Sequence, residues 1–369
     1  MIADGVHERF MRMALRLAQR GLGDVWPNPS VGCVIVEQNA RVVGRGWTQS
    51  GGRPHAETEA LGRAGARAKG ATAYVTLEPC AHQGATGPCA QALIDAGVSR
   101  IFASCEDPDR RVAGKGHAML RAAGIEVHAG LLAKESTATN AGFFSRVERG
   151  RPLIALKLAT SLDGKIALKN GQSRWITGED ARRAGHLLRS RHDAVLVGMG
   201  TVLADDPELT CRIAGIRRPR LLRIVADADA RLPMQSKLAA SARATAVWLL
   251  CAHDADASRQ SALAAKGVRL VHVPRAADGI DIARAFAQLA GEGVTRILVE
   301  GGARLAARIC QANLVDRLAW FRSPTAIGAD GVSALAALSL ETLQAMPRFK
   351  LAHMMRLGQD VLETYEPAT

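Results

Sequence analysis

HAETEALGRAGARAKGATAYVTLEPCAHQGATGPC, residues 55–89, is the stretch that decides how the first half of the chain folds. It supplies one imidazole (His55), two thiols (Cys80 and Cys89) and a carboxylate (Glu57) two residues after the imidazole. A catalytic zinc ion needs three protein ligands, an open fourth position and a nearby acid/base. The segment therefore predicts a zinc enzyme, in which the imidazole and both thiols bind the metal and Glu57 transfers protons.

The same stretch predicts the local structure of an α/β domain. HAETEALGRAGARA is typical of a helix entered from Pro54, and ATAYVTL is typical of a buried strand. Pro88 suits the first position of the next helix, so Cys89 is expected at a helix N-terminus, where the helix dipole favours a thiolate. Helix starts and strand ends meet at one edge of an open α/β sheet. The predicted ligands should therefore converge at that edge.

The rest of the first half continues the alternation of helices and strands. A helix is expected over residues 7–20, followed by strands in VGCVIV and RVVGRGW. Later elements are the helix CAQALIDAG, the strand SRIFASC, the helix KGHAMLRAAG, the strand IEVHAG and a helix that ends near Gly150. This order predicts an open sheet covered by helices.

The length of the chain predicts a second domain. A chain of 369 residues exceeds the roughly 250–300 residues at which single cores usually stop growing. Arg151-Pro152 is the best boundary, which gives domains at 1–150 and 151–369. The second half alternates again and ends in strands that suggest a mixed sheet. No G-x-G-x-x-G follows a strand, but Glu300-Gly301-Gly302 offers a glycine turn at a helix start, which either binds a phosphate or forms an ordinary tight turn.

Composition narrows the class of protein. The formal charge of +13 is carried mostly by Arg in no long block, and aromatic residues are scarce at 4%. These features disfavour nucleic acid as a partner and favour anionic small molecules. The seven cysteines are odd in number and scattered, which indicates reduced thiols. No apolar run approaches the length of a membrane span, so we expect a cytoplasmic protein with no membrane partner.

The order of these residues is also the pattern of a zinc deaminase. That pattern is His-x-Glu at a helix start, followed by a strand, Pro-Cys and a second Cys. TLEPCAHQGATGPC, together with HAETEAL, DPDRRVAGKG and PNPSVGCVIV, resembles the deaminase domain of the bifunctional riboflavin-biosynthesis deaminase/reductases over residues 7–150. The resemblance implies a cytidine-deaminase-like three-layer domain within an α/β fold class. It also implies hydrolytic removal of an amine from a phosphorylated diaminopyrimidine.

The chemistry of the residues agrees with this resemblance. Zinc held by His55, Cys80 and Cys89 would lower the pKa of a water in its fourth position toward about 7. Glu57 would then take the water proton and deliver it to the leaving amine. The alternative for Glu57 is an ordinary acidic residue in the first turn of a helix, favoured by the dipole.

The resemblance also assigns residues around the first site. Asn28 and His82 fall where the family binds its substrate. Ala85 and Thr48 stand where relatives carry a basic residue and often a histidine, both associated with binding the ribose phosphate. Zinc ligation is untouched by these departures, but recognition of the phosphate is affected. Arg53 is a candidate replacement.

The second half resembles the reductase domain of the same family, which has a dihydrofolate-reductase-like fold and uses NADPH. The resemblance rests on KLATSLDGKIA, SRWITG, VGMGTVLADDPELTCR and ILVEGGARLA. It implies hydride transfer to the ribosyl group, which gives a ribityl chain. The residues that fall where the family binds NADPH are Ala159, Trp175, Thr201, Asp205, Gly302, Ala303, Arg304 and Leu305. Those that fall where it binds the pyrimidine are Ser173, Arg189, Leu209, Arg212 and Glu300, and the unranked candidates for a proton donor are Lys157, Asp163 and Glu300.

Two other interpretations stay open at the level of sequence. The first half could deaminate another nucleotide or a tRNA base, with the second half as an accessory nucleotide-binding domain. Alternatively, zinc could be purely structural in a nucleic-acid-binding or scaffold protein, which would require a fourth protein ligand. A homo-oligomer is expected, although the sequence does not set the number of subunits.

Overall fold

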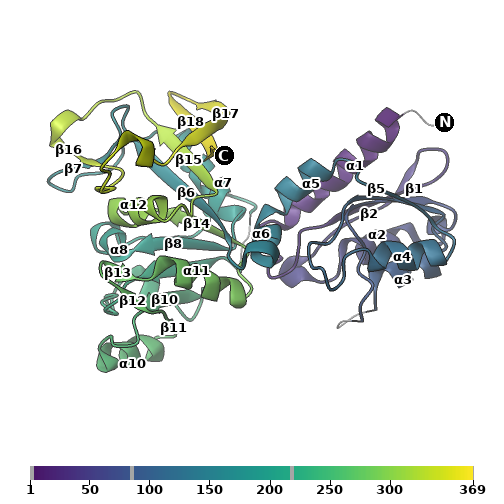
Figure 1. Cartoon of the computed structure of the whole chain (residues 1–369), viewed down its shortest axis with the longest axis horizontal. Coiled ribbons are helices and arrows are strands. Elements are labelled where there is room, and N and C mark those ends of the chain that lie inside the picture. The colour runs from purple at the N-terminus through teal and green to yellow at the C-terminus, as the bar shows by residue number, and fades with distance from the viewer. Residues whose placement is uncertain (1–3, 84–86, 217–219, 369) are drawn as a thin grey trace. The chain divides into compact units, whose positions relative to one another are not determined.

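The computed structural model describes residues 4–83, 87–216 and 220–368. Contacts divide the chain into two compact units, Met1–Gly150 and Arg151–Thr369. Each unit has its own large sheet (Figure 1). All seven cysteines lie in the described part of the chain, and none of them forms a disulfide. Among the described residues, no helix has the length and apolar character needed to cross a bilayer.

The first unit is built on a five-stranded sheet with the strand order β2-β1-β3-β4-β5. β1 pairs antiparallel with β2 and β3, whereas β3, β4 and β5 run parallel. The strands are β1 (Gly32–Val36), β2 (Val42–Trp47), β3 (Thr72–Leu77), β4 (Arg100–Cys105) and β5 (Glu126–Ala129). The helices are α1 (Asp4–Ala18), α2 (Ala56–Ala64), α3 (Cys89–Asp95), α4 (Lys115–Ala122), α5 (Ala133–Thr139) and α6 (Ala141–Arg149).

Alternation along the strands gives this sheet two buried faces. One face packs with residues of α1 in a core cluster that contains Met11, Val34, Val36, Tyr74 and Phe102. The other face packs with α2, α3 and α4 in a second cluster that contains Cys33, Ile35, Ala60, Val75, Leu93 and Leu120. The sheet therefore lies between two helical layers (Figure 1), and the predicted three-layer architecture is confirmed.

The C-terminal part of this unit differs from the sequence prediction. One helix was expected to run through Asn140 to Gly150, but α5 and α6 are separate helices that meet at Asn140. The Asn140 amide is buried and binds the backbone of Ser30, accepting from its N–H at 2.8 Å and donating to its carbonyl at 3.0 Å. This tertiary contact explains the interruption, because it holds Asn140 outside helical geometry at φ −98° and ψ 18°.

The second unit contains a nine-stranded sheet with the order β11-β10-β9-β8-β14-β6-β15-β18-β17. The pairs from β11 to β15 are parallel, whereas β18 pairs antiparallel with both β15 and β17, so the predicted mixed sheet is confirmed. Its strands are β6 (Leu153–Thr160), β8 (Ala194–Gly198), β9 (Leu222–Ala226), β10 (Val247–Cys251), β11 (Arg269–His272), β14 (Arg296–Glu300), β15 (Arg317–Arg322), β17 (Phe349–Leu357) and β18 (Asp360–Pro367). Two small two-stranded sheets pair β12 (Arg275–Ala276) with β13 (Gly279–Ile280), and β7 (Lys165–Leu168) with β16 (Gly331–Ser333).

The helices of the second unit include elements that the sequence analysis missed. They are α7 (Glu179–Ser190), α8 (Met199–Asp205), α9 (Lys237–Ala240), α10 (Ala257–Ala265), α11 (Ile282–Gly291) and α12 (Ala303–Gln311). The sequence predicts a strand over DAVLVGMG, residues 193–200, but β8 ends at Gly198 and α8 begins at Met199. α10 buries Leu263 alone, so it shows little of the apolar periodicity that signals a helix. α9 and the exposed edge strand β17 were also missed.

Glycines in β2 allow α2 to lie directly on the sheet. A Cβ on Gly46 would stand 2.1 Å from the carbonyl oxygen of Ala56, and one on Gly44 would stand 2.2 Å from that of Ala60. Both obstacles are backbone atoms, so a side chain cannot be accommodated by a rotamer change. The N-terminus of α2, where His55 and Glu57 lie, is therefore positioned by this contact.

We predict that Gly46→Ala destabilises the first unit by about 1–3 kcal/mol, the usual cost of overpacking. Gly62→Ala is the matched control, because Gly62 lies on α2, the helix that Gly46 contacts, and a Cβ there meets nothing within 4 Å. Alanine at that exposed helical position should be neutral or stabilising by up to about 1 kcal/mol. Thermal and urea unfolding of both variants would measure the difference, and equal stability would contradict the close-contact explanation.

Candidate functional site

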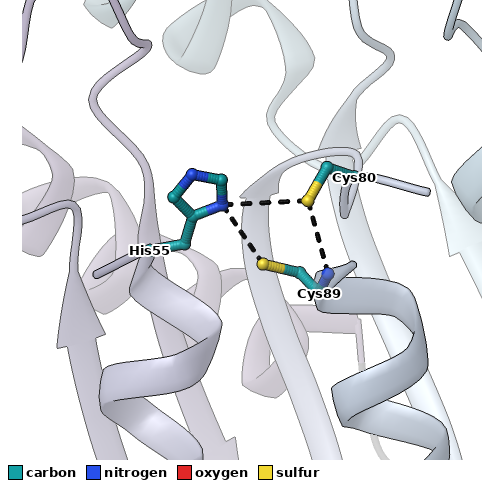
Figure 2. Close-up of side chains that lie close together, drawn as sticks. All are labelled: His55, Cys80 and Cys89. Atoms are coloured by element: carbon teal, nitrogen blue, oxygen red, sulfur yellow. Dashed lines mark hydrogen bonds between the residues drawn. The ribbon is translucent and has the colours of Figure 1, made fainter. Parts of the chain in front are cut away.

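Three segments of the first unit bring His55, Cys80 and Cys89 together, as Figure 2 shows. His55 is the N-cap residue of α2, Cys89 is the first residue of α3, and Cys80 lies in the loop after β3. The Nδ1 atom of His55 lies 3.2 Å from Sγ of Cys89 and 3.8 Å from Sγ of Cys80. All three ligand atoms lie within 4.8 Å of one another. Pro88, predicted at the first helical position of α3, is its N-cap residue instead.

This spacing fits a zinc ion. Zn–S bonds of about 2.3 Å and Zn–N bonds of about 2.0–2.1 Å, arranged tetrahedrally, separate ligand atoms by roughly 3.5–3.8 Å. A hydrogen bond with the Cys89 thiol is the largest of the effects that lower the pKa of Cys80 to about 4. The backbone N–H of Cys89 also donates to the Cys80 sulfur at 3.3 Å. Cys80 is therefore a thiolate at neutral pH, which is the form that binds metals.

Glu57 lies in the first turn of α2, close to the three ligands. Its side chain is buried, and the residue is 4% exposed. Desolvation is the main cause that raises the pKa of Glu57 to about 7, while the charge of His55 opposes the shift. A carboxyl group with this pKa can both accept and donate a proton near neutral pH.

A cavity of about 780 Å³ opens beside these residues. Its lining includes His55, Glu57 and Cys80, together with the predicted substrate residues Asn28 and His82. Arg53, Arg111 and Arg146 supply positive charge to the same cavity. The structure therefore brings the predicted residues of the first half to one site.

Asn28 and Thr48 are held at this cavity in different ways. A Cβ on Gly52 would stand 1.9 Å from the amide nitrogen of Asn28, so the amide packs directly on the glycine. Thr48 is buried, and its hydroxyl oxygen accepts the backbone N–H of Val31 at 2.9 Å, which ties it to the start of β1. Ala85, the other departure from the resemblance, lies outside the described residues.

Two adjoining cavities of about 650 and 510 Å³ mark a site in the second unit. Both are lined by Lys157, Ala159, Trp175, Arg189 and Arg212. Glu300 lines the first cavity, and Ser173, Asp205 and Leu209 line the second. These residues come from β6, β14, α7, α8 and the loops at 172–177 and 206–214.

A bidentate ion pair between Arg189 and Glu300 lines the first of these two cavities. Nε and Nη2 of Arg189 donate to the two carboxylate oxygens of Glu300 at 2.5 and 2.9 Å. Desolvation acts against ionisation of Glu300, but the Arg189 guanidinium prevails and the pKa of Glu300 falls to about 2. Lys157 has its pKa lowered by desolvation, which Glu300 counteracts. Glu300 is thus an acceptor at neutral pH, and Lys157 is the nearby candidate donor.

The hydrogen bonds of Asp163 suit a structural role better than that of a proton donor. It accepts from the Ser161 hydroxyl at 2.6 Å and from the backbone N–H groups of Ile327 and Gly328 at 3.1 and 2.6 Å. The Ser161 bond is the largest of the effects that lower the pKa of Asp163 to about 2. Asp163 therefore anchors a turn as a carboxylate.

The remaining predicted residues lie around the glycine turn after β14. Thr201, Gly302, Ala303, Arg304 and Leu305 line neither of the two cavities. Thr201 nevertheless adjoins the turn, because its hydroxyl oxygen lies 3.0 Å from the point that a Cβ on Gly301 would occupy. Gly301 and Gly302 both have positive φ, at 88° and 85°, and α12 starts at the next residue. The turn presents backbone N–H groups, whereas the Leu305 side chain is buried core.

Sequence reasoning missed one wall of the first cavity. Phe143, Arg146 and Val147 of α6 line it together. Their i, i+3, i+4 spacing places them on one helical face, and this spacing could have been noticed in the sequence. The sequence alone does not show what this helical face contacts, because only the folded chain brings α6 to the cavity.

The comparisons with known proteins agree with this geometry. Residues 5–105 match the cytidine and deoxycytidylate deaminase zinc-binding region, and residues 152–362 match the RibD C-terminal domain. The chain is 41% identical to riboflavin biosynthesis protein RibD of Escherichia coli (strain K12), over 96% of this chain and 97% of that protein. The chain belongs to the RibD family. Riboflavin biosynthesis protein RibD of Bacillus amyloliquefaciens is 38% identical over 98% of this chain and 96% of its own.

Solved RibD structures share the whole fold. Acinetobacter baumannii RibD (form 1) is similar with a TM-score of 0.88 at 35% identity, covering 99% of this chain and 100% of that one. A deaminase/reductase from Thermotoga maritima gives a TM-score of 0.85 at 31% identity, covering 99% of both chains. The chain is therefore a bifunctional enzyme of riboflavin biosynthesis with a zinc-binding deaminase region and an NADPH-dependent reductase domain. The predicted fold class and family are confirmed, and the scaffold interpretation is excluded.

We predict that removing zinc abolishes deamination and spares reduction, because the ligand cluster and the reductase cavities lie in different units. Ammonia release and NADPH oxidation would be measured separately, each with its own substrate, on one chelator-treated preparation. Cys89→Ser should have the same effect without chelator and should lower the zinc content. Loss of both activities by a folded, zinc-free protein would contradict this separation.

Proposed function

We propose that residues 1–150 form the deaminase domain and residues 151–369 the reductase domain, and that the two act in sequence. The substrate is a phosphorylated pyrimidine, and we assign it as the diamino-hydroxy-phosphoribosylamino-pyrimidine on which the Thermotoga maritima relative is named to act. The observation that carries this proposal is the convergence of His55, Cys80 and Cys89 in one cavity with Glu57.

The deamination step depends on proton transfer by Glu57. Bound zinc supplies the acidity that makes a hydroxide nucleophile available near neutral pH. Glu57 accepts the proton that this activation releases and then donates it to the departing amine. Its pKa of about 7 suits both roles, and it lines the cavity that also contains His55 and Cys80.

The reduction step needs a proton donor beside the sugar. NADPH supplies the hydride that the anomeric carbon of the ribosyl group receives, and as the carbon–oxygen bond of the ring breaks, the ring oxygen needs a proton. Lys157 lines both cavities of the second unit and has a lowered pKa. Glu300 and Asp163 are both ionised at neutral pH, with pKa values of about 2. We therefore rank Lys157 first as the donor.

Recognition of the phosphate in the first cavity is assigned to Arg53 and Arg146. Both line the cavity, and an arginine fork matches the geometry of a phosphate. Arg111 also lines it, but its side chain is 88% exposed, so solvent screens its charge strongly. Arg53 and Arg146 would then replace the basic groups that relatives place at positions 48 and 85.

We also propose that the enzyme is a cytoplasmic homo-oligomer. β17 is the last strand of the nine-stranded sheet, and Leu351, Met354 and Met355 on it are 55%, 61% and 46% exposed. An apolar edge strand is suited to antiparallel pairing with a second copy about a two-fold axis. Zinc binding through Cys80 and Cys89 requires reduced thiols, which supports a reducing compartment.

We predict that Lys157→Met lowers kcat of the reductase step by about 10²–10⁴, the usual contribution of a general acid. The deaminase step should keep its rate, since Lys157 lies in the other unit. In the wild type, kcat of reduction should fall as pH rises through the lysine pKa, which lies below the ordinary value of about 10.4. A Lys157→Met enzyme with unchanged kcat would contradict the assignment.

We predict that Arg53→Ala and Arg146→Ala each raise the KM of deamination by about tenfold or more, because hydrogen bonds to charged groups are worth about 1.5–3 kcal/mol. Arg149→Ala is the control, since Arg149 is exposed on α6, the helix of Arg146, and does not line the deaminase cavity. With the dephosphorylated substrate, the two variants should match the wild type. An unchanged KM for the phosphorylated substrate would contradict the assignment.

A further inference from the structure

Glu78 is a buried carboxylate in the zinc-ligand loop, by which we mean residues 78–80, between the end of β3 and Cys80. It follows Leu77, the last residue of β3, precedes Cys80 by two residues, and is 5% exposed. Oε1 accepts the backbone N–H groups of Gly116 at 2.8 Å and His117 at 3.2 Å. Oε2 accepts those of Gly114 at 2.9 Å and Asp107 at 3.3 Å. One side chain thus binds four amides of residues 107–117.

Three of these amides belong to the start of α4. This helix begins at Lys115, and its N-cap residue, Gly114, has φ 77° and offers no side chain to cap it. The first N–H groups of a helix have no partner within the helix, and a negative charge there is stabilising. Glu78 therefore caps α4 from a segment more than thirty residues earlier in the chain.

A close backbone contact reinforces the same junction. A Cβ on Gly116 would stand 1.9 Å from the carbonyl oxygen of Pro79. The start of α4 thus lies directly on the residue that precedes Cys80. The position of Cys80 and the position of α4 are fixed against each other through Glu78 and Pro79.

The segment that Glu78 fixes forms a wall of the deaminase cavity. Asp107, Asp109, Arg111 and Val112 all line the cavity that contains His55 and Glu57. This loop joins β4 to α4, so its two ends are at Cys105 and Lys115. Glu78 binds it near both ends, at Asp107 and at Gly114.

We propose that Glu78 is a positioning residue for deamination. It holds the cavity wall formed by residues 107–112 in a fixed position relative to the zinc-ligand loop. It acts through backbone amides and need not touch the reacting atoms. This inference rests on the proposed function of the first unit. It predicts a role that depends on the negative charge of Glu78, because glutamine has the same shape but only one acceptor oxygen, and its NH₂ group would face amide N–H donors.

The test compares Glu78→Gln and Glu78→Asp with Glu106→Gln in the full-length, zinc-loaded enzyme. Glu106 is the matched control because it lies in the same loop and is exposed. For Glu78→Gln, we expect kcat/KM of deamination to fall by about 10²-fold, the scale of a displaced binding group, with most of the loss in KM. Zinc content and the reductase step should stay at wild-type values. Glu78→Asp is one methylene shorter and should be impaired as well, whereas Glu106→Gln should not.

Hydrogen exchange provides a second measurement, part of which needs only the wild type. The amides of Gly114, Gly116 and His117 should be protected in the wild type and should exchange faster in Glu78→Gln. Rapid exchange of these amides in the wild type would overturn the proposal even if no variant folds. So would a Glu78→Gln enzyme with a lower melting temperature but unchanged kcat and KM, or one that loses its zinc. Failure of the proposed function would be distinct, because the wild type and Glu106→Gln would then release no ammonia.

Discussion

Two sulfur atoms and one imidazole nitrogen have to meet within a few ångströms, and the first unit is arranged around this constraint. The ligands come from a helix N-cap, a loop after a strand and a helix start, which the sheet brings to one place. Two of these segments pack backbone against backbone with their neighbours. The start of α2 contacts Gly46 through Ala56, and the loop before Cys80 contacts Gly116 through Pro79. Glycines at these two contacts thereby help to set where the metal ligands lie.

The two units use buried charge in opposite ways. In the first unit, burial without a strong ion pair leaves Glu57 with a pKa of about 7, so it can exchange protons near neutrality. In the second, the Arg189 fork keeps Glu300 ionised, and desolvation lowers the pKa of Lys157. One carboxylate is thus suited to proton transfer and the other to binding, and the difference comes from the neighbours of each group rather than from its type.

Much of this was predictable from the sequence, for reasons that differ between elements. The His-x-Glu and Pro-Cys motifs lie at element ends, where the local pattern of strands and helices already predicts convergence. The division of α5 from α6 was not predictable, because it depends on a contact between Asn140 and Ser30, far apart in the chain. The cavity wall of α6 and the four amides bound by Glu78 likewise exist only once the sheet is formed. In the second unit, α10 and β17 were not predicted, because both are largely exposed and their sequences show little apolar periodicity.

In the proposed function, one chain first deaminates and then reduces the same pyrimidine, at two separate sites. The most direct test supplies the phosphorylated diaminopyrimidine and NADPH to the zinc-loaded chain and measures ammonia released and NADPH oxidised. We expect equal amounts from the wild type. We expect neither product at an appreciable rate from Glu57→Gln, which should retain zinc and still oxidise NADPH when given the deaminated intermediate. Ammonia release without NADPH oxidation by the folded wild type, or loss of both steps in Glu57→Gln, would contradict this order of reactions.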